Sequence, residues 1–368
     1  MRIGVMLRHL NDLGGVTVYT KNIIENLLEI DNENDYVFFY NSDSMLNSYS
    51  KYKNVKEVVI NKKNKFLWDQ YYIPKAVKSE KIDIIFNPKL SIPLFAPAKR
   101  ILTMHGLEQF ACPKVFKLFD NIYVHIMMPL FCRRANAVIV MSNTGKKDLI
   151  KYLHVKEDKI EPIYESYHKR FTVIDYGDEL IRIKNKYNLP DKFLLFVGGL
   201  TPLKNFSNII KAFNIVRKKI PVKLVFAGFK RWKYSKDLEL IKRLRLQKEI
   251  ITLGFVPDDD LPYLYNLAQC FVFPSLYEGF GIPVLEAQAC GCPVVSTKTG
   301  ATPEISGGAA MLVNPYNHRE IAQAVYNVLT EDDLKEKLVK TGTENAKKYN
   351  WLETAKKTLQ LFEKISQS

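Results

Sequence analysis

Residues 273–287, with the sequence FPSLYEGFGIPVLEA, place two glutamates around a glycine-containing turn. A strand is expected to end near Phe273, and Pro283 suits the first position of the helix that follows, where its missing N–H is not needed. Glu278 then lies in the loop between strand and helix, and Glu286 in about the first turn of the helix. The N–H groups of residues 279–282 would form an anion-binding nest, and both carboxylates are good acceptors for sugar or ribose hydroxyls. The alternative is structural: a turn Glu and a helix-start Glu favoured by the helix dipole.

A second glycine-containing turn follows another predicted strand. Gly198 and Gly199 permit close approach of the backbone to a ligand, and Lys204 comes just before a helix, where it can meet a phosphate as a point charge. Lys230 and Arg231 follow the end of a further strand. Two loops would therefore bring cations to the same edge of one sheet.

The first half of the chain offers fewer polar candidates. Gly14 and Gly15 form a flexible loop before a predicted helix. His105 follows the predicted strand Arg100–Met104 and is a candidate polar group at the strand's carboxyl end, although a lone histidine is more often structural.

Short apolar runs alternate with amphipathic stretches along the whole chain, which predicts βαβ units and parallel sheets in an α/β protein. The expected strands are Arg2–Met6, Tyr36–Tyr40, Lys56–Ile60, Ile82–Phe86, Arg100–Met104, Ala137–Val140, Ile160–Tyr164, Phe193–Val197, Val222–Ala227, Ile250–Leu253, Cys270–Phe273, Pro293–Ser296 and Ala310–Val313. The principal expected helices are Gly15–Ile30, Phe66–Ser79, Lys114–Arg134, Asn143–Leu153, Asn317–Leu329, Asp332–Tyr349 and Trp351–Ile365.

The chain has 368 residues, of which 47% are hydrophobic and 25% charged. This balance is typical of soluble globular proteins and excludes collagen-like and disordered classes, and the length favours two domains. Five cysteines indicate a reducing compartment, and residues 1–6 resemble a first strand rather than a signal peptide. We therefore expect a cytoplasmic protein.

The net charge of +15 is concentrated in two blocks. Residues 51–100 hold 12 Lys and Arg against 4 Asp and Glu, and residues 201–250 hold 14 against 3. A phosphorylated ligand or an anionic membrane surface is a candidate partner, and a plain solubilising surface is the alternative. Nucleic acid is not expected, because no nucleic-acid-binding motif accompanies the charge.

The sequence lacks the motifs of two common classes of site, the nicotinamide-binding site and the zinc site. A nicotinamide-dependent oxidoreductase needs Gly-x-Gly-x-x-Gly after the first strand, and residues 4–15 do not supply it. No Cys and His spacing resembles a zinc site, and Cys290 and Cys292 are more simply explained by packing. No metal and no tightly bound cofactor are therefore expected.

Together these segments resemble the retaining, nucleotide-sugar-dependent glycosyltransferases of family 4, which have the GT-B fold. The family's Glu-x7-Glu pattern corresponds to Glu278 and Glu286. Other segments match in order, namely VGGL at 197–200, KN at 204–205, GFVP at 254–257, ACGCPVV at 289–295 and GATPE at 300–304. The resemblance extends through nearly the whole chain and is densest from Phe193 to about Asn314.

The resemblance implies two Rossmann-like, doubly wound domains that face each other across a cleft. Residues 1–180 would form the acceptor-side domain and residues 181–350 the nucleotide-sugar donor domain. Residues 351–368 would form a helix that crosses back to the first domain.

The family's roles carry over to this chain as expectations. Glu286 would bind the ribose hydroxyls, Glu278 would lie beside the donor sugar, and Lys204 would neutralise the departing diphosphate. His105 would reach the donor sugar from the first domain. Backbone groups would contact phosphate, sugar or acceptor at Gly14, Gly15, Gly198, Gly199, Phe280, Gly281 and Ile282.

One departure from the family pattern concerns an arginine that often accompanies the lysine. The two places where it would stand hold Gly199 or Leu200 and Leu203. We hypothesise that Lys230 or Arg231 supplies the missing charge.

The resemblance implies a metal-independent hexosyltransferase with a nucleotide-diphosphate sugar as co-substrate. The short Lys-Asn turn after Pro202 resembles mannosyltransferase-like members and favours GDP-mannose over a UDP-sugar. The implied acceptor is an oligosaccharide or lipid-linked glycan of a surface polysaccharide such as lipopolysaccharide. The alternative function is a catalytically weakened nucleotide-sugar-binding or scaffold protein of a glycan assembly complex.

Two segments of the first half bear on a membrane. Residues 62–72 mix basic and aromatic side chains, as a patch at the inner face of a membrane would. Phe116, Phe119, Tyr123, Ile126 and Met127 form an apolar stripe that could touch lipid, but at helical spacing such a stripe more often belongs to the core.

Overall fold

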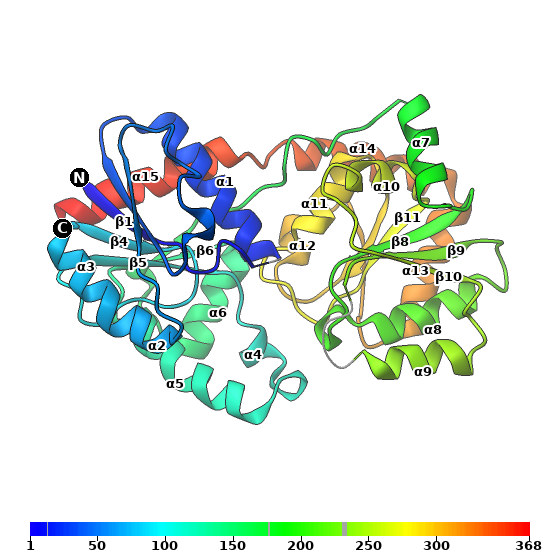
Figure 1. Cartoon of the computed structure of the whole chain (residues 1–368). Coiled ribbons are helices and arrows are strands. Elements are labelled where there is room, and N and C mark those ends of the chain that lie inside the picture. The colour runs from blue at the N-terminus through cyan, green and yellow to red at the C-terminus, as the bar shows by residue number, and fades with distance from the viewer. Residues whose placement is uncertain (13, 176, 230–233) are drawn as a thin grey trace. The chain divides into compact units, whose positions relative to one another are not determined.

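The computed structural model describes the chain except residues 13, 176 and 230–233 (Figure 1). The chain divides into two compact units, which we call unit 1 (residues 1–165 and 350–368) and unit 2 (residues 166–349). The boundary expected at residue 180 thus lies at residue 165, and the last helix belongs to unit 1.

Within the described residues, unit 1 has one sheet of seven parallel strands in the order β3-β2-β1-β4-β5-β6-β7. Most of these strands are apolar runs buried on both faces, as parallel sheets covered by helices require. Their bounds are β1 (Arg2–Met6), β2 (Asp35–Tyr40), β3 (Val55–Val59), β4 (Ile84–Asn87), β5 (Lys99–Met104), β6 (Ala137–Val140) and β7 (Ile160–Pro162).

Helices cover both faces of the unit 1 sheet (Figure 1). The last helix packs on α1, and the Phe362 ring lies 5.2 Å from that of Phe86 in β4. The helical elements of unit 1 include α1 (Gly15–Ile30), α2 (Lys65–Leu67), the π-helical turn η2 (Trp68–Tyr72), α3 (Ile73–Ser79), α4 (Glu108–Ala111), α5 (Leu118–Arg134), α6 (Asn143–Leu153) and α15 (Trp351–Gln367).

The described part of unit 2 contains one sheet of six parallel strands in the order β10-β9-β8-β11-β12-β13. Its strands are β8 (Phe193–Val197), β9 (Lys223–Ala227), β10 (Ile250–Gly254), β11 (Cys270–Phe273), β12 (Val294–Thr297) and β13 (Met311–Val313). Its helical elements are α7 (Asp178–Lys186), η5 (Pro202–Lys204), α8 (Phe206–Val216), α9 (Ser235–Arg243), α10 (Leu261–Leu267), α11 (Ile282–Ala289), α12 (Thr302–Ile305), α13 (His318–Thr330) and α14 (Asp332–Ala346).

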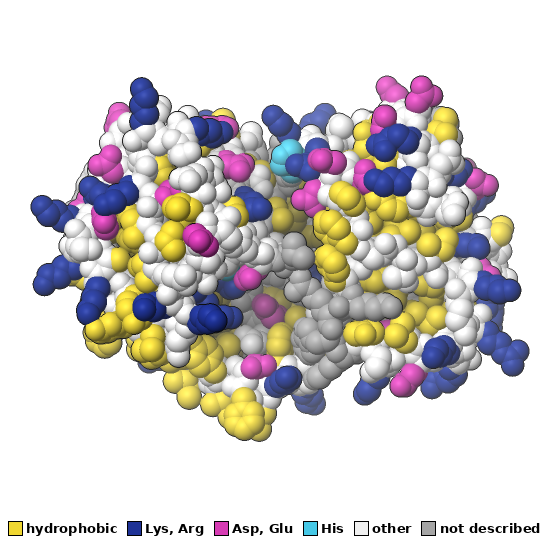
Figure 2. Space-filling model, in the orientation of Figure 1, with side chains coloured by type: hydrophobic (Ala, Val, Ile, Leu, Met, Phe, Trp, Pro, Cys, Tyr) yellow, Lys and Arg dark blue, Asp and Glu magenta, His cyan; other side chains and the backbone are white. Residues whose placement is uncertain are grey.

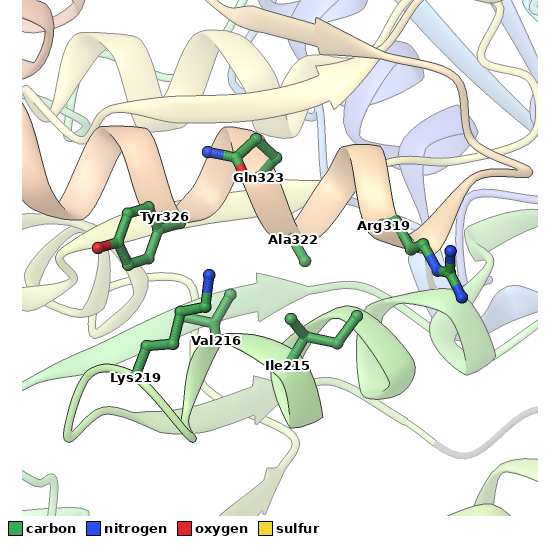
Figure 3. Close-up of a pocket in the computed structure, with 7 residues that line it drawn as sticks. All are labelled: Ile215, Val216, Lys219, Arg319, Ala322, Gln323 and Tyr326. Carbon is green, nitrogen blue, oxygen red and sulfur yellow. The ribbon is translucent and has the colours of Figure 1, made fainter.

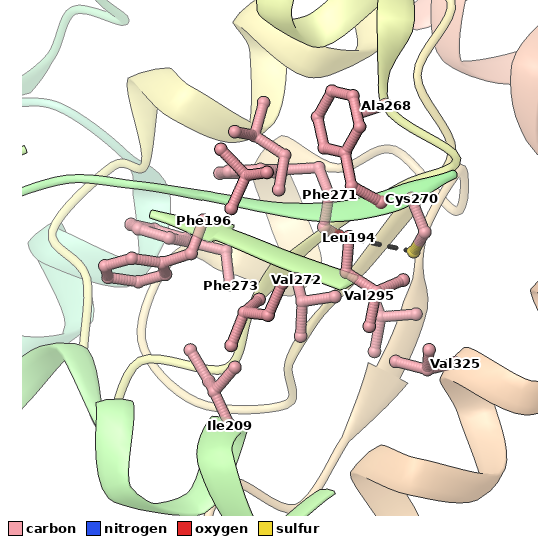
Figure 4. Packing of buried hydrophobic residues seen from close by; sticks show 14 of the residues in the cluster. Leu194, Phe196, Ile209, Ala268, Cys270, Phe271, Val272, Phe273, Val295 and Val325 are labelled. Carbon is pink, nitrogen blue, oxygen red and sulfur yellow. Dashed lines mark hydrogen bonds between the residues drawn. The ribbon is translucent and has the colours of Figure 1, made fainter. Parts of the chain in front are cut away.

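The core of unit 2 lies between its sheet and the helices on either face. Aromatic side chains of the central strands stack there, with the rings of Phe271 and Phe273 5.3 Å apart (Figure 4). Ile209 of α8 and Val325 of α13 close one side of this cluster. Cys290 and Cys292 are buried in the same core, which confirms the packing role expected of them.

Both sheets reverse the direction of chain progression at one point, between β1 and β4 in unit 1 and between β8 and β11 in unit 2. Doubly wound sheets bind ligands at such a switch point, outside the carboxyl ends of the strands. The predicted α/β class with two doubly wound parallel sheets is therefore confirmed. The topology also indicates that a ligand site in either unit would lie at the carboxyl edge of its sheet. In the described parts of the chain, no helix is both long and apolar enough to cross a membrane.

Candidate active site

Lys204 and Glu278 meet at the switch point of unit 2. Lys204 ends the short turn after β8, and Glu278 lies in the loop after β11. The Lys204 Nζ atom is 2.6 Å from Glu278 Oε1, and it lies 4.7 Å from the centroid of the Phe273 ring. The side chains are 25% and 13% exposed, so the pair is sheltered while its cation remains accessible to an anion. The structure thus joins two motifs that the sequence analysis treated separately.

Hydrogen bonds fix the two loops that carry this pair. The Leu276 N–H donates to the Leu203 carbonyl oxygen at 2.7 Å. Asn205 has left-handed backbone geometry (φ 58°), and its amide donates to the carbonyl oxygens of Pro274 at 2.9 Å and Pro315 at 2.6 Å. The Lys204 ammonium is therefore positioned before any ligand arrives, which is what electrostatic stabilisation of a developing charge requires.

The loop after β12 supports the backbone of Glu278. The Ala301 N–H donates to the Glu278 carbonyl oxygen at 2.9 Å. Gly300 has φ +62°, and a Cβ atom at this position would lie 2.4 Å from the same oxygen. Only glycine satisfies both constraints, so the GATPE segment holds Glu278 in place.

Glu286 is the fifth residue of α11, which places it in the second helical turn and not the first. The Tyr265 hydroxyl of α10 donates to Glu286 Oε2 at 3.0 Å. Burial raises the pKa of Glu286 to about 7; the Tyr265 hydrogen bond and Arg170 oppose this rise, whereas Asp258 adds to it. A carboxyl group poised near neutral pH can accept hydrogen bonds from a diol once it is ionised.

The turn of residues 280–282 starts α11, an eight-residue helix whose N-terminal cap is Gly281. Its N-terminal end carries the partial positive charge of the helix dipole. Phe280 is buried, and its ring meets that of Tyr349 edge to face at 5.8 Å. Phe280 therefore serves packing through its side chain, and any ligand contact from this residue must come from the backbone.

The Gly198-Gly199 turn packs closely against the end of β9. The Gly198 N–H donates to the Ala227 carbonyl oxygen at 2.9 Å, and a Cβ atom on Gly228 would lie 2.1 Å from the Gly198 oxygen. This turn therefore has a structural reason for its glycines in addition to the predicted ligand contact. Lys230 and Arg231, the proposed substitutes for the missing arginine, lie outside the described residues.

In unit 1, His105 lies at the carboxyl end of β5. Its Nε2 atom is 2.8 Å from the Pro88 carbonyl oxygen, and its ring meets Tyr19 edge to face at 4.9 Å. Burial lowers the pKa of His105 to about 4, assisted by the charge of Lys89. Because a carbonyl can only accept, Nε2 carries the proton of the neutral ring, and Nδ1 is an acceptor suited to a hydroxyl group. Gly14 and Gly15 lie at the start of α1.

An aromatic pair in unit 2 was missed by the sequence analysis. Phe229 and Phe255 follow β9 and β10 and stack with their ring centroids 5.2 Å apart and an interplanar angle of 17°. They are 38% and 54% exposed, so the pair presents aromatic surface to solvent. The sequence did contain a signal for Phe255, which belongs to the GFVP segment that matches the family pattern. Tyr265 and Asn205 were also not assigned a role, because their partners lie far away in the sequence.

A groove of about 270 Å3 lies between α8 and α13, outside this cluster. Figure 3 shows Lys219 after α8 and Tyr326 of α13 in this groove, with the Lys219 Nζ atom 4.8 Å from the Tyr326 ring centroid. Among the described residues, no carboxylate lines this groove. The groove is therefore a feature of the helical surface and shares no residue with the Lys204 and Glu278 pair.

The two doubly wound parallel sheets define the GT-B fold. A solved structure of Anabaena Alr3699/HepE in complex with UDP and glucose superposes with a TM-score of 0.79 at 17% identity, covering 99% of this chain and 100% of that one. Residues 13–166 match the family described as Glycosyltransferase Family 4, and residues 178–345 match Glycosyl transferases group 1. The chain belongs to glycosyltransferase family 4.

Two relatives from Escherichia coli are named for mannose transfer. The serotype-specific mannosyltransferase WbdA is 32% identical over 245 residues, which cover 64% of this chain but only 29% of WbdA. The O-antigen chain mannosyltransferase B is 27% identical over 296 residues, covering 78% of this chain and 76% of that protein. The predicted membership of a glycosyltransferase family is therefore confirmed.

Proposed function

We propose that this protein transfers mannose from GDP-mannose, with retention of configuration and without a metal ion, to a growing lipid-linked surface glycan at the inner face of a membrane. The observation that carries the proposal is the Lys204 and Glu278 ion pair at the unit 2 switch point, with Glu286 beyond it on α11. The mannosyltransferase names of two relatives favour mannose over the hexose of a UDP-sugar.

The donor would bind along the carboxyl edge of unit 2. Ribose hydroxyls donate to Glu286, and the diphosphate accepts from Lys204. When the diphosphate takes over the Lys204 ammonium, the Glu278 carboxylate has acceptor capacity left for a hydroxyl of the sugar. The exposed Phe229 and Phe255 rings offer an apolar platform on which a nucleobase can stack.

Bond cleavage separates the anomeric carbon from the diphosphate oxygen, and negative charge develops on the diphosphate. Lys204 and the N-terminal end of α11 would stabilise that charge. The acceptor hydroxyl forms its bond to the anomeric carbon on the face that the diphosphate leaves, and its proton goes to the departing diphosphate oxygen. In unit 1, neutral His105 would accept a hydrogen bond from a sugar hydroxyl through Nδ1.

The test is thermal unfolding with GDP, UDP and ADP and their sugar conjugates, on the wild type, on Glu286→Ala and on Glu336→Ala as an exposed control on α14. A ligand at 100 times its dissociation constant adds about 2.7 kcal/mol to the free energy of unfolding. We expect a shift with the guanine nucleotides in the wild type and the control, and its loss in Glu286→Ala. Incubation with GDP-mannose and a chelator, followed by NMR of the product's anomeric proton, tests metal independence and retention.

A shift with uridine nucleotides alone would replace GDP-mannose by a UDP-sugar and leave the site assignment intact. If no nucleotide shifts the wild type, the donor site is wrong and the scaffold alternative replaces it. An inverted anomer in the product would refute the retaining mechanism independently of the donor.

A further inference from the structure

Two cationic side chains flank the switch point of unit 1. Arg8 follows β1 and Lys89 follows β4, and these two strands are neighbours where the chain progression reverses. Unit 1 therefore places cations at the topological position where unit 2 holds Lys204.

Arg8 and Lys89 each have a carboxylate neighbour, but at a longer distance than in a close ion pair. The Arg8 Nε atom is 3.5 Å from Asp69 Oδ1, and both atoms lack a hydrogen-bond partner among the described residues. The other carboxylate oxygen of Asp69 accepts from Ser91 at 2.8 Å. Lys89 Nζ lies 3.7 Å from the exposed Asp12 carboxylate. The Arg8 guanidinium also lies over the Trp68 ring, 5.9 Å from its centroid, and its Nε atom is buried. Because the side chain is 19% exposed, an incoming anion would accept hydrogen bonds from the Nη groups at the end of the guanidinium.

Mutual repulsion indicates that the cations are crowded. Burial lowers the pKa of Lys89, the charges of Arg8 and Lys65 lower it further, and Asp12 opposes them. Lys65 is exposed at the start of α2. An anion bound among these three side chains would relieve their repulsion.

An exposed apolar face adjoins this cluster on α5. The inner side of the helix packs in the core, where Val124, Met128 and Phe131 are buried. Its outer side is also apolar, with Leu118, Phe119, Ile122, Tyr123, Ile126 and Leu130 between 36% and 83% exposed. The expectation that the stripe belongs to the core is therefore wrong for Phe119, Tyr123 and Ile126, because the core contacts of α5 come from its other side.

The apolar face continues onto neighbouring elements. Phe66, Leu67 and Tyr71 on α2 and η2, and Phe95 in the loop after β4, are each at least 47% exposed. Gln70 joins that loop to η2, because its amide donates to the Ile92 carbonyl oxygen at 2.9 Å. Figure 2 shows apolar side chains gathered where α2 and α5 lie, with basic side chains beside them.

Asp69 connects the apolar face to the cations. It lies on η2, the element that also carries Tyr71 of the apolar face, and its Oδ1 atom is 3.5 Å from Arg8 Nε. The flanking segments are basic: residues 62–75 hold 4 lysines against 1 aspartate, and residues 114–134 hold 4 Lys and Arg against 1 aspartate. A molecule with an anionic head group and an apolar chain would place its head group at Arg8 and Lys89 and its chain against the apolar face.

We propose that Arg8 and Lys89 bind the phosphate of a long-chain lipid phosphate that carries the glycan acceptor, and that the apolar face of α5, α2 and η2 lies in the membrane that holds the lipid. This inference rests on the proposed function, in that the bound lipid must be a glycosyl acceptor. Two other ligands explain fewer of these features. An ordinary anionic phospholipid would need only the exposed lysines to bind its head group, and a soluble phosphate would need no apolar face.

The experiment measures sedimentation of the full chain with three kinds of vesicle. These are phosphatidylcholine alone, phosphatidylcholine with a polyisoprenyl phosphate, and phosphatidylcholine with phosphatidylglycerol at equal total charge. Variants Arg8→Gln and Lys89→Gln test the phosphate site and Phe119→Ser the apolar face, with Lys236→Gln and Ile181→Ser as exposed controls in unit 2.

We expect the wild type and both controls to bind the polyisoprenyl phosphate vesicles more tightly than the phosphatidylglycerol vesicles. Arg8→Gln or Lys89→Gln should remove about tenfold of that preference, the size of one charge-assisted hydrogen bond. Phe119→Ser should weaken binding to all three vesicles by about tenfold.

Equal binding to both anionic vesicles, unchanged in Arg8→Gln and Lys89→Gln, would overturn the phosphate site and leave a general anionic surface. Failure of the wild type to bind any vesicle would overturn the inference altogether. The nucleotide-induced thermal shift needs no lipid and reads the donor site separately, so a loss of one proposal is distinguishable from a loss of the other. Retention of that shift in each variant also shows that the variant is folded.

Discussion

The affinity for the donor should depend on pH through Glu286. Its pKa lies at about 7 in the free protein because burial disfavours the carboxylate. Ribose hydroxyls donate more strongly to the carboxylate than to the neutral acid, so tight binding is linked to loss of the proton. With this pKa, about a tenth of the protein is ionised at pH 6 and about nine tenths at pH 8, which predicts roughly tenfold tighter binding at pH 8. Affinity should become independent of pH well above 8.

Calorimetric titration with GDP-mannose measures this effect, since its diphosphate has no secondary ionisation in the range. Repeating the titration in buffers of different ionisation enthalpy counts the protons released. Glu286→Gln should bind about 10- to 100-fold more weakly at pH 8 and lose the pH dependence. Tyr265→Phe should move the midpoint to higher pH, because the lost hydrogen bond favours the ionised carboxylate. A wild-type affinity that is constant from pH 6 to 8, or an unchanged slope in Glu286→Gln, would refute the reasoning.

Three further predictions concern other parts of the chain. Lys204→Ala should lower kcat at saturating donor by about 10²- to 10³-fold, because the leaving diphosphate loses its cation, and a steady-state rate within a few-fold of wild type would contradict this. Gly300→Ala should lower Tm much more than Gly308→Ala: both glycines have positive φ, which costs an alanine about 1 kcal/mol, but only at Gly300 does the new Cβ collide with backbone, 2.4 Å from the Glu278 oxygen. Glu165 is buried, which raises its pKa from 4.5 to about 8, so its contribution to stability is fully present below pH 4.5 and falls by roughly 1.4 kcal/mol per pH unit as the pH rises toward 8. Denaturant titrations from pH 5 to 8 should show a flatter profile for Glu165→Gln, and identical profiles would exclude this group as the cause.

Most of the fold could be predicted from the sequence, because parallel strands that are buried on both faces appear as short apolar runs with clear ends. The expected Phe273 and Val197 strand ends are those observed. Since parallel strands place their carboxyl ends on one edge, the side of the sheet that holds Lys204 and Glu278 also follows from the pattern.

Contacts between distant residues could not be predicted in the same way. The bond between Tyr265 and Glu286 joins two helices, and its existence depends on the rotation of each helix about its axis. Asn205 adopts a left-handed conformation that its residue type permits but does not require. The stripe through Phe119 and Ile126 has the periodicity of a core helix, and only the packing of the opposite side shows that it faces outward.

The order of chain segments has a consequence for synthesis on the ribosome. Unit 2 is one uninterrupted stretch of 184 residues, from 166 to 349, whereas unit 1 needs residues 350–368 as well. The ribosome adds about 5–20 residues per second. The first 165 residues of unit 1 are therefore complete roughly 10–40 s before the helix that covers α1 and Phe86 is made. We therefore expect unit 2 to fold while it emerges, and the nascent unit 1 to expose the apolar surface beneath α15 throughout that interval. The unit begun first is the one completed last.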